Sequence, residues 1–115
     1  MNKYGNILFA LNKPKEALAV FKNMVTLNPK HVQGLSNLGY LTMMINSDAT
    51  TSLNYINQAI ALDPDYEQAH INKAAVYASQ SRWYEATEAL EFFIKHHPNA
   101  KKSKTTLRKI EQAVK

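Results

Sequence analysis

The stretch HVQGLSNLGYLTMMINSDATTSLNYINQAIALDP, residues 31–64, holds one complete copy of a pattern that repeats along the chain. It ends in Asp63-Pro64, and the same position is taken by Asn28-Pro29 one period earlier and by His97-Pro98 one period later. The period is therefore 34 to 35 residues. A fixed period of this length is typical of stacked supersecondary units, which build a solenoid.

Small residues recur at two distances before each of these prolines. They are Gly5, Gly39 and Ala74, which lie 24, 25 and 24 residues before the proline, and Ala17, Ser52 and Ala86, which each lie 12 before it. A glycine inside a helix costs about 1 kcal/mol relative to alanine. We therefore expect these positions to mark close helix-helix contacts, whose packing offsets that cost.

The middle unit is one residue longer than the third, and the extra residue lies between Gly39 and Ser52. The same interval contains Asn46-Ser47-Asp48, a run of residues that favour turns. We expect the extra residue to lengthen this turn and to leave both flanking helices intact.

Apolar residues recur at spacings of three and four within each unit, which predicts two amphipathic helices per unit. Pro14 suits the first turn of a helix, and the residue before each later proline is disfavoured in helical geometry. The predicted fold is all-α. The predicted helices are seven, at residues 2–12, 14–27, 31–45, 49–62, 66–80, 82–96 and 101–114.

The composition argues against catalysis and against a bound cofactor or metal. The chain has no cysteine and only three glycines, which excludes thiolate ligands and Gly-rich phosphate loops. Its four histidines show no metal-ligand spacing along one helix, and we predict that His96 and His97 close a helix. Glu85, Glu88 and Glu91 are interpreted as an exposed, solvated rim. No apolar stretch approaches the roughly 20 residues of a membrane span.

The positive charge is concentrated at one end of the sequence. Residues 1–100 carry eight Lys and Arg and eight Asp and Glu, so the whole excess of +5 lies in the last fifteen residues. A protein that binds duplex nucleic acid would carry a basic stripe along its fold. A neutral body with a basic end helix makes nucleic acid an unfavoured partner.

These units resemble the tetratricopeptide repeat (TPR), which has a large residue, Leu-Gly and Tyr in its first helix and Ala, Phe and a closing Pro in its second. The matching residues are Gly5, Leu8, Ala17, Phe21 and Pro29; Leu35, Leu38, Gly39, Thr42, Ile56, Ala59 and Pro64; and His70, Ala74, Tyr77, Ala86, Leu90 and Pro98. His70 takes the place of a large aromatic residue. The resemblance implies a right-handed α-solenoid of three helix-turn-helix units, 1–31, 32–66 and 67–100, followed by a basic capping helix at 101–115. The first unit begins about three residues late, so we expect a fragment of a larger protein.

In a right-handed stack of such units the first helices line the concave side. Their outward faces carry polar and aromatic residues at steps of four and three, which we predict to contact a bound peptide: Asn2, Asn6, Phe9, Gln33, Asn37, Tyr40, Met44, Gln68 and Asn72. Side-chain amides carry both donors and acceptors and so suit the backbone of an extended peptide. The predicted function is a non-catalytic protein-protein interaction scaffold.

One known binding mode of the family is a clamp for a C-terminal carboxylate. Asn6 and Asn37 match its two asparagines, whereas Asn2, Gln68 and Asn72 occupy the three places where the clamp has cations. Without cations a terminal carboxylate loses its charge-assisted hydrogen bonds. The sequence therefore disfavours this mode.

Two alternatives remain open at this stage. Apolar residues of the first helix, Tyr4, Leu8 and Leu11, offer a surface for self-association into a homo-oligomer. The basic cap helix offers a surface for docking on an acidic partner, RNA or an acidic membrane surface. The identity of the partner, the role of the parent protein and the compartment, cytoplasmic or periplasmic, stay undetermined.

Overall fold

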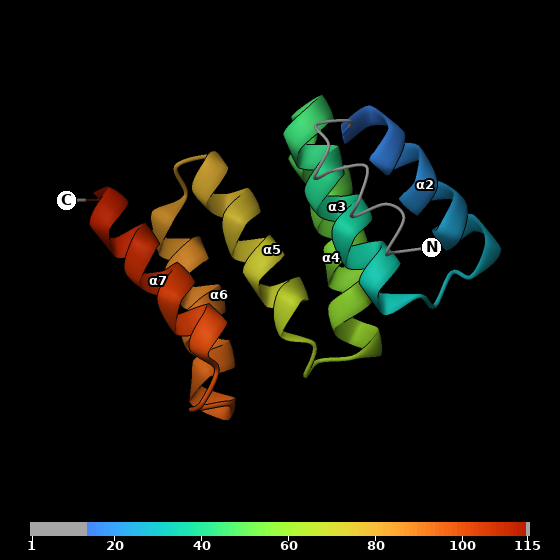
Figure 1. Cartoon of the computed structure of the whole chain (residues 1–115). Helices are drawn as coiled ribbons and strands as arrows, with labels where there is room; N and C mark the ends of the chain where they lie inside the picture. Colours follow the sequence, from blue (N-terminus) through green and yellow to red (C-terminus); the bar gives the residue numbers. More distant parts are fainter. Residues whose placement is uncertain (1–13, 115) are drawn as a thin grey trace.

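The computed structural model describes residues 14–114, and this part of the chain consists of α-helices joined by short turns (Figure 1). The helices are α2 (Pro14–Leu27), α3 (Val32–Asn46), α4 (Ala49–Leu62), α5 (Glu67–Ser79), α6 (Trp83–His96) and α7 (Lys101–Val114). The all-α prediction is confirmed, and these six helices begin and end within one residue of their predicted bounds. The helix predicted at 2–12 lies outside the described residues.

The helices repeat one contact pattern along the chain. The helices α3 and α4 form one packed pair, and α5 and α6 form the next. Each first helix also contacts the following first helix, α3 with α5 and α5 with α7, and each second helix contacts the first helix after it. Figure 1 shows α3, α5 and α7 in one layer and α4 and α6 behind them. Units that contact only their neighbours define a solenoid.

The small residues predicted from the spacing lie where paired helices touch. In the α3–α4 pair the Ser52 hydroxyl donates a hydrogen bond to the carbonyl oxygen of Gly39. A Cβ atom on Gly39 would lie 2.5 Å from Cγ1 of Ile56 and 2.7 Å from the carbonyl oxygen of Ser52. The two backbones are therefore too close for any side chain at Gly39.

The expectation of a lengthened turn in the middle unit was wrong. Only Ser47 and Asp48 separate α3 from α4, whereas residues 80–82 separate α5 from α6. The extra residue lies in α3, which has 15 residues against 13 in α5. Ser47 adopts a left-handed conformation (φ 55°) and donates its N–H to Met43, which closes α3. The Asp48 side chain accepts from the Thr51 N–H at 3.1 Å, so α4 starts at once.

Histidines close two of the helix ends. His31 precedes α3, and its Nδ1 accepts a hydrogen bond from the Gly34 N–H at 2.9 Å. His97 follows α6, with its Nδ1 3.2 Å from the carbonyl oxygen of Phe93 and its Nε2 3.0 Å from Oδ1 of Asp65. The capping role predicted for His97 is confirmed, and the Asp65 contact links the turn before α5 to the turn before α7.

Among residues 14–114, buried apolar residues form three clusters that lie between helices of adjacent units. They are Ala17, Phe21, Leu38 and Leu41; Leu35, Ala59 and Ala69; and Ala74, Ala86, Leu90 and Ile110. Because each cluster draws on neighbouring units, no unit buries its apolar face alone. Within residues 14–114, no helix has the length and apolar character needed to cross a membrane.

His70 occupies an interior position, as its place in the repeat predicts. Its side chain is 5% exposed, its ring lies 4.6 Å from the ring of Phe93, and its Nε2 is 2.9 Å from the carbonyl oxygen of Pro64. Burial lowers the pKa of His70, and the hydrogen bond to Pro64 only partly opposes this shift. His70 therefore packs as a neutral aromatic residue.

Candidate binding groove

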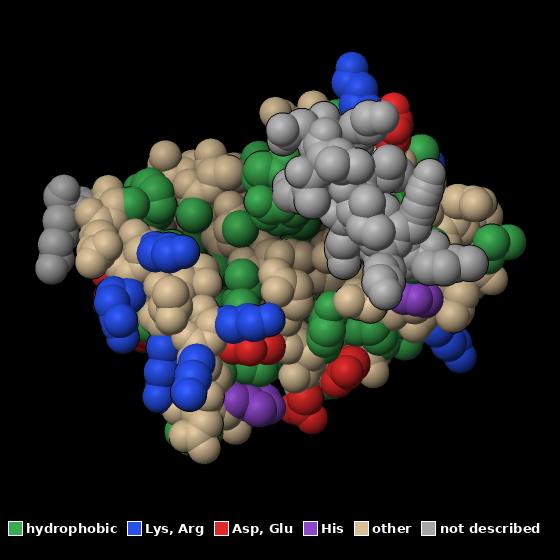
Figure 2. All heavy atoms as spheres, in the orientation of Figure 1, with side chains coloured by type: hydrophobic (Ala, Val, Ile, Leu, Met, Phe, Trp, Pro, Cys, Tyr) green, Lys and Arg blue, Asp and Glu red, His purple; other side chains and the backbone are tan. Residues whose placement is uncertain are grey.

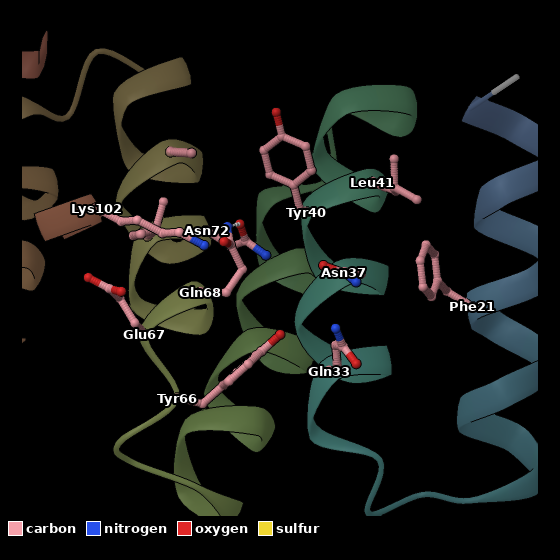
Figure 3. Close-up of a pocket in the computed structure, with 12 residues that line it drawn as sticks. Phe21, Gln33, Asn37, Tyr40, Leu41, Tyr66, Glu67, Gln68, Asn72 and Lys102 are labelled. Atoms are coloured by element: carbon pink, nitrogen blue, oxygen red, sulfur yellow. Dashed lines mark hydrogen bonds between the residues drawn. The ribbon is translucent and has the colours of Figure 1, made fainter. Parts of the chain in front are cut away.

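A groove of about 750 Å³ runs along the side of the molecule formed by the first helices (Figure 3). It lies mainly between α3 and α5, with α2 and α7 contributing at its edges. The residues that line it are Phe21, Gln33, Asn37, Tyr40, Leu41, Tyr66, Glu67, Gln68, Ile71, Asn72, Ala75 and Lys102. The mixture of amide, aromatic and aliphatic side chains gives it both hydrogen-bonding and apolar surface.

Five of the nine residues predicted to contact a peptide line this groove. They are Gln33, Asn37, Tyr40, Gln68 and Asn72. Met44 is exposed at the far end of α3 and does not line the groove. Asn2, Asn6 and Phe9 lie outside the described residues.

Asn37 and Asn72 belong to the same predicted surface but have different surroundings. Asn72 is buried, and its Nδ2 donates to the Ser36 carbonyl oxygen at 3.1 Å and to the Ser36 hydroxyl at 2.8 Å. Its Oδ1 accepts from Nε2 of Gln68 at 2.8 Å. The Asn72 amide thus ties α5 to α3. The Asn37 side chain is half-buried, and no hydrogen bond joins its amide to another described residue.

Tyr66 lines the groove although the sequence analysis did not select it. It directly precedes α5, outside the helical pattern from which the groove residues were chosen. Figure 3 shows its hydroxyl pointing toward Gln33, with which it forms a hydrogen bond. Burial raises the pKa of Tyr66, the bond from Gln33 lowers it in part, and the charge of Asp63 adds to the rise. Tyr66 and Tyr40 give the groove two aromatic surfaces with polar tips.

Three apolar residues of the lining were also missed. Phe21 and Leu41 come from the contact between α2 and α3, and Ile71 lies beside Asn72 on α5. These residues carry the same apolar periodicity as the core, so their pattern alone does not separate a core residue from one at the edge of a groove.

The end of the groove next to α7 contains one acidic and one basic residue. Glu67 accepts hydrogen bonds at its Oε2 from the Ser103 N–H (3.0 Å) and the Ser103 hydroxyl (2.8 Å). Ser103 is in the first turn of α7, so this carboxylate caps a helix N-terminus from another unit. Lys102 is the neighbouring residue of α7 and lines the groove.

The acidic residues of α6 make ordinary surface contacts. Glu85 pairs with Arg82 at 2.5 Å, and Glu88 accepts a hydrogen bond from Tyr84. The Glu88 charge and this bond raise the pKa of Tyr84. Across residues 14–114, no group of three or more His, Asp or Glu side chains is arranged to hold a metal ion.

No protein-family model matches the sequence. A curated relative is the protein described as "Probable UDP-N-acetylglucosamine--peptide N-acetylglucosaminyltransferase SPINDLY" from Solanum lycopersicum, which is 28% identical over 96 residues. The match covers 84% of this chain and 10% of the relative. The chain thus spans about a tenth of the length of that protein.

Several solved TPR domains have the same helical arrangement. The first TPR domain of human RPAP3 aligns with a TM-score of 0.82 and 24% identity over 98% of this chain and 88% of that domain. The first TPR of Spaghetti (RPAP3) bound to the HSP90 peptide SRMEEVD aligns with a TM-score of 0.80 and 23% identity, over 98% and 91%. The second TPR domain of human RPAP3 in complex with the HSP70 peptide SGPTIEEVD gives 0.77 and 21%, over 95% and 90%. The chain therefore has the TPR fold, which confirms the family resemblance at the level of structure.

Proposed function

We propose that this chain is a non-catalytic protein-interaction scaffold that binds a peptide or protein segment in the groove between α3 and α5. The observation that carries the proposal is the composition of that groove, in which Asn37, Gln33 and two tyrosines, Tyr40 and Tyr66, face one cavity of about 750 Å³. Amide side chains can donate to and accept from a peptide backbone, and tyrosines add apolar contact at small entropic cost.

Two of the similar structures support the class of partner. They contain short peptides, one from HSP90 and one from HSP70, bound to TPR domains. We transfer only the class of partner, a peptide segment. The sequence identity to this chain is low, and this chain has no cation at the three positions where the family's clamp carries one.

The groove residues have two roles in this proposal. Gln33, Asn37 and Tyr40 contact the bound segment, together with Asn2, Asn6 and Phe9 of the first unit. Asn72 acts as a positioning residue, because its amide is engaged by Ser36 and Gln68 within the protein. The proposed division of the chain is three units, 1–31, 32–66 and 67–100, with the capping helix at 101–115.

The test uses a ligand selected by the protein itself. Random peptides displayed on phage are selected on the intact chain, and one synthetic winner is titrated by calorimetry against wild type, Asn37→Ala and Asn54→Ala. Asn37→Ala should weaken binding by about 1 to 2 kcal/mol, since one amide can form two hydrogen bonds with a peptide. Asn54 is an exposed residue of α4 outside the groove, so Asn54→Ala should leave affinity unchanged.

Affinity lost with Asn54→Ala and kept with Asn37→Ala would place the binding surface on the second helices and would rule out the groove.

Self-association stays a prediction, because Tyr4, Leu8 and Leu11 lie outside the described residues. Light scattering of the intact chain over a range of concentrations measures it.

A further inference from the structure

Helix α7, which contributes Lys102 to the lining of the groove, carries most of the net positive charge of the chain. It contains five basic residues, Lys101, Lys102, Lys104, Arg108 and Lys109, against one acidic residue, Glu111. All six side chains are exposed. On the face shown in Figure 2, Lys and Arg side chains gather over α7. The groove is therefore bordered on one side by a positive field.

Lys102 brings part of this charge into the groove. In Figure 3 its side chain extends from α7 across α5 toward Gln68. Buried Ser103 and Ile110 hold the inner face of α7 against the body. Lys109 lies seven residues after Lys102, two helical turns along the same side of α7. Lys104 lies on the opposite flank of that helix.

The acidic residue next to Lys102, Glu67, is held by Ser103 and forms no ion pair with Lys102. Figure 3 shows the carboxylate of Glu67 pointing back toward α7, where Ser103 donates two hydrogen bonds to it. The N-terminal end of α7 supplies the partial positive charge that this carboxylate faces. No described residue forms an ion pair with Lys102. The remaining lining of the groove is uncharged.

We infer that the groove selects a segment with acidic side chains, and that Lys102 is the residue that makes this selection. The inference rests on the proposed function, since it names the kind of segment that binds. The complementary group is a carboxylate in the interior of the segment, which forms a charge-assisted hydrogen bond with the Lys102 ammonium. A terminal carboxylate is a different ligand, and its expected cation places at Gln68 and Asn72 carry amides.

The probes are three peptides of about 12 residues, acetylated at the N-terminus and amidated at the C-terminus, each based on the phage-selected sequence. They carry Glu, Gln or Lys at the same alternate positions. Fluorescence anisotropy measures their binding at about 0.02 M and 0.2 M salt, because screening weakens exposed charge pairs over this range. The Glu peptide should bind about 10-fold more tightly than the Gln peptide at low salt, and the Lys peptide should bind worst.

Lys102→Gln should remove most of the preference for Glu over Gln. Lys104→Gln removes the same charge from the other flank of α7, so this matched control should keep the preference. Equal effects of the two substitutions would overturn the assignment to Lys102. They would show that only the net charge of α7 matters.

The failures of the two proposals can be distinguished. Equal binding of the Glu and Gln peptides, with both weakened by Asn37→Ala, would keep the groove and overturn the acidic selection. Binding by none of the three peptides would overturn both proposals. If the Gln peptide with a free C-terminal carboxylate binds as tightly as the Glu peptide, the assignment of the ligand group to an interior side-chain carboxylate would be overturned. Tighter, Lys102-dependent binding of polyadenylate RNA or of phosphatidylserine vesicles would overturn a peptide as the occupant.

Discussion

The α3–α4 pair and the α5–α6 pair solve the same packing problem with different residues. In the first pair Gly39 and Ser52 meet through a hydrogen bond, and the space excludes even a Cβ atom on Gly39. In the second pair the same positions carry Ala74 and Ala86, which are fully buried and pack with Leu90. The comparison shows that the repeat requires a small volume at this contact and not one particular residue.

A second pair of corresponding positions differs in the size of the packed side chains. Leu35 packs with the small Ala59 in the first pair, whereas one period later His70 packs with the large Phe93. The ring of Phe93 also stacks on that of His97, with centroids 4.2 Å apart and an interplanar angle of 11°. The same repeat position is therefore inert to pH in one pair and holds a titratable ring in the other.

The largest expected effect is the loss of stability when the small residues Gly39 and Ala86 are enlarged. Gly39→Leu and Ala86→Leu should each cost several kcal/mol of unfolding free energy through overpacking, and Gly39→Ala should already cost about 1 to 3 kcal/mol. The reason is the backbone oxygen of Ser52, which cannot move aside as a side chain would. Urea denaturation measures these changes. Wild-type midpoints for the three variants would show that the pairing register is wrong.

The next effect compares two asparagines of the groove. Asn72→Ala should cost about 1 to 3 kcal/mol of stability, because it removes the side-chain donor to the buried carbonyl and hydroxyl oxygens of Ser36. Asn37→Ala should change stability by less than about 0.5 kcal/mol. Denaturation curves of both variants check this. Equal losses would show that Asn37 also supports the fold.

A smaller effect is the dependence of stability on pH, which we expect from His70 in the α5–α6 pair. Burial lowers the pKa of His70 below its unfolded value of about 6.5. The unfolded chain therefore binds more protons than the folded chain in the window below pH 6.5. Stability from the neutral ring is present above that pH and declines as pH falls through the window. Denaturation midpoints measured from pH 7.5 down to about 5 should fall more steeply in wild type than in His70→Phe. Parallel profiles would exclude His70 as the cause.

The smallest effect is expected on the outer face of α6. Glu88 is exposed, and its described contact is a hydrogen bond from Tyr84. Glu88→Ala should stay within about 0.5 kcal/mol of wild type. A larger loss by thermal denaturation would mean that this face is covered in the native protein.

Much of the fold and about half of the described groove lining could be predicted from the sequence. Helix bounds followed from prolines and from apolar periodicity, which act over a few residues. Tyr66 was missed because it begins the helix predicted at 66–80 out of step with Gln68 and Asn72. Lys102 was missed because it lies on the cap, so neither residue belongs to the repeating face. Asn72 was predicted as a ligand contact, but its amide is engaged by Ser36, 36 residues earlier in the chain. Sequence spacing carries no signal of that pairing.

The sequence by itself determined the repeat, the helices and the positions that must be small, because these depend on local geometry and on a period that is visible in the chain. Only the tertiary structure decided which polar residues are used up inside the protein and which face the groove. It also decided that Glu67 would cap α7 and leave Lys102 beside the cavity. The physical reason is that hydrogen bonds and charges between units depend on how far each helix is rotated and shifted against its neighbours, which periodicity does not specify.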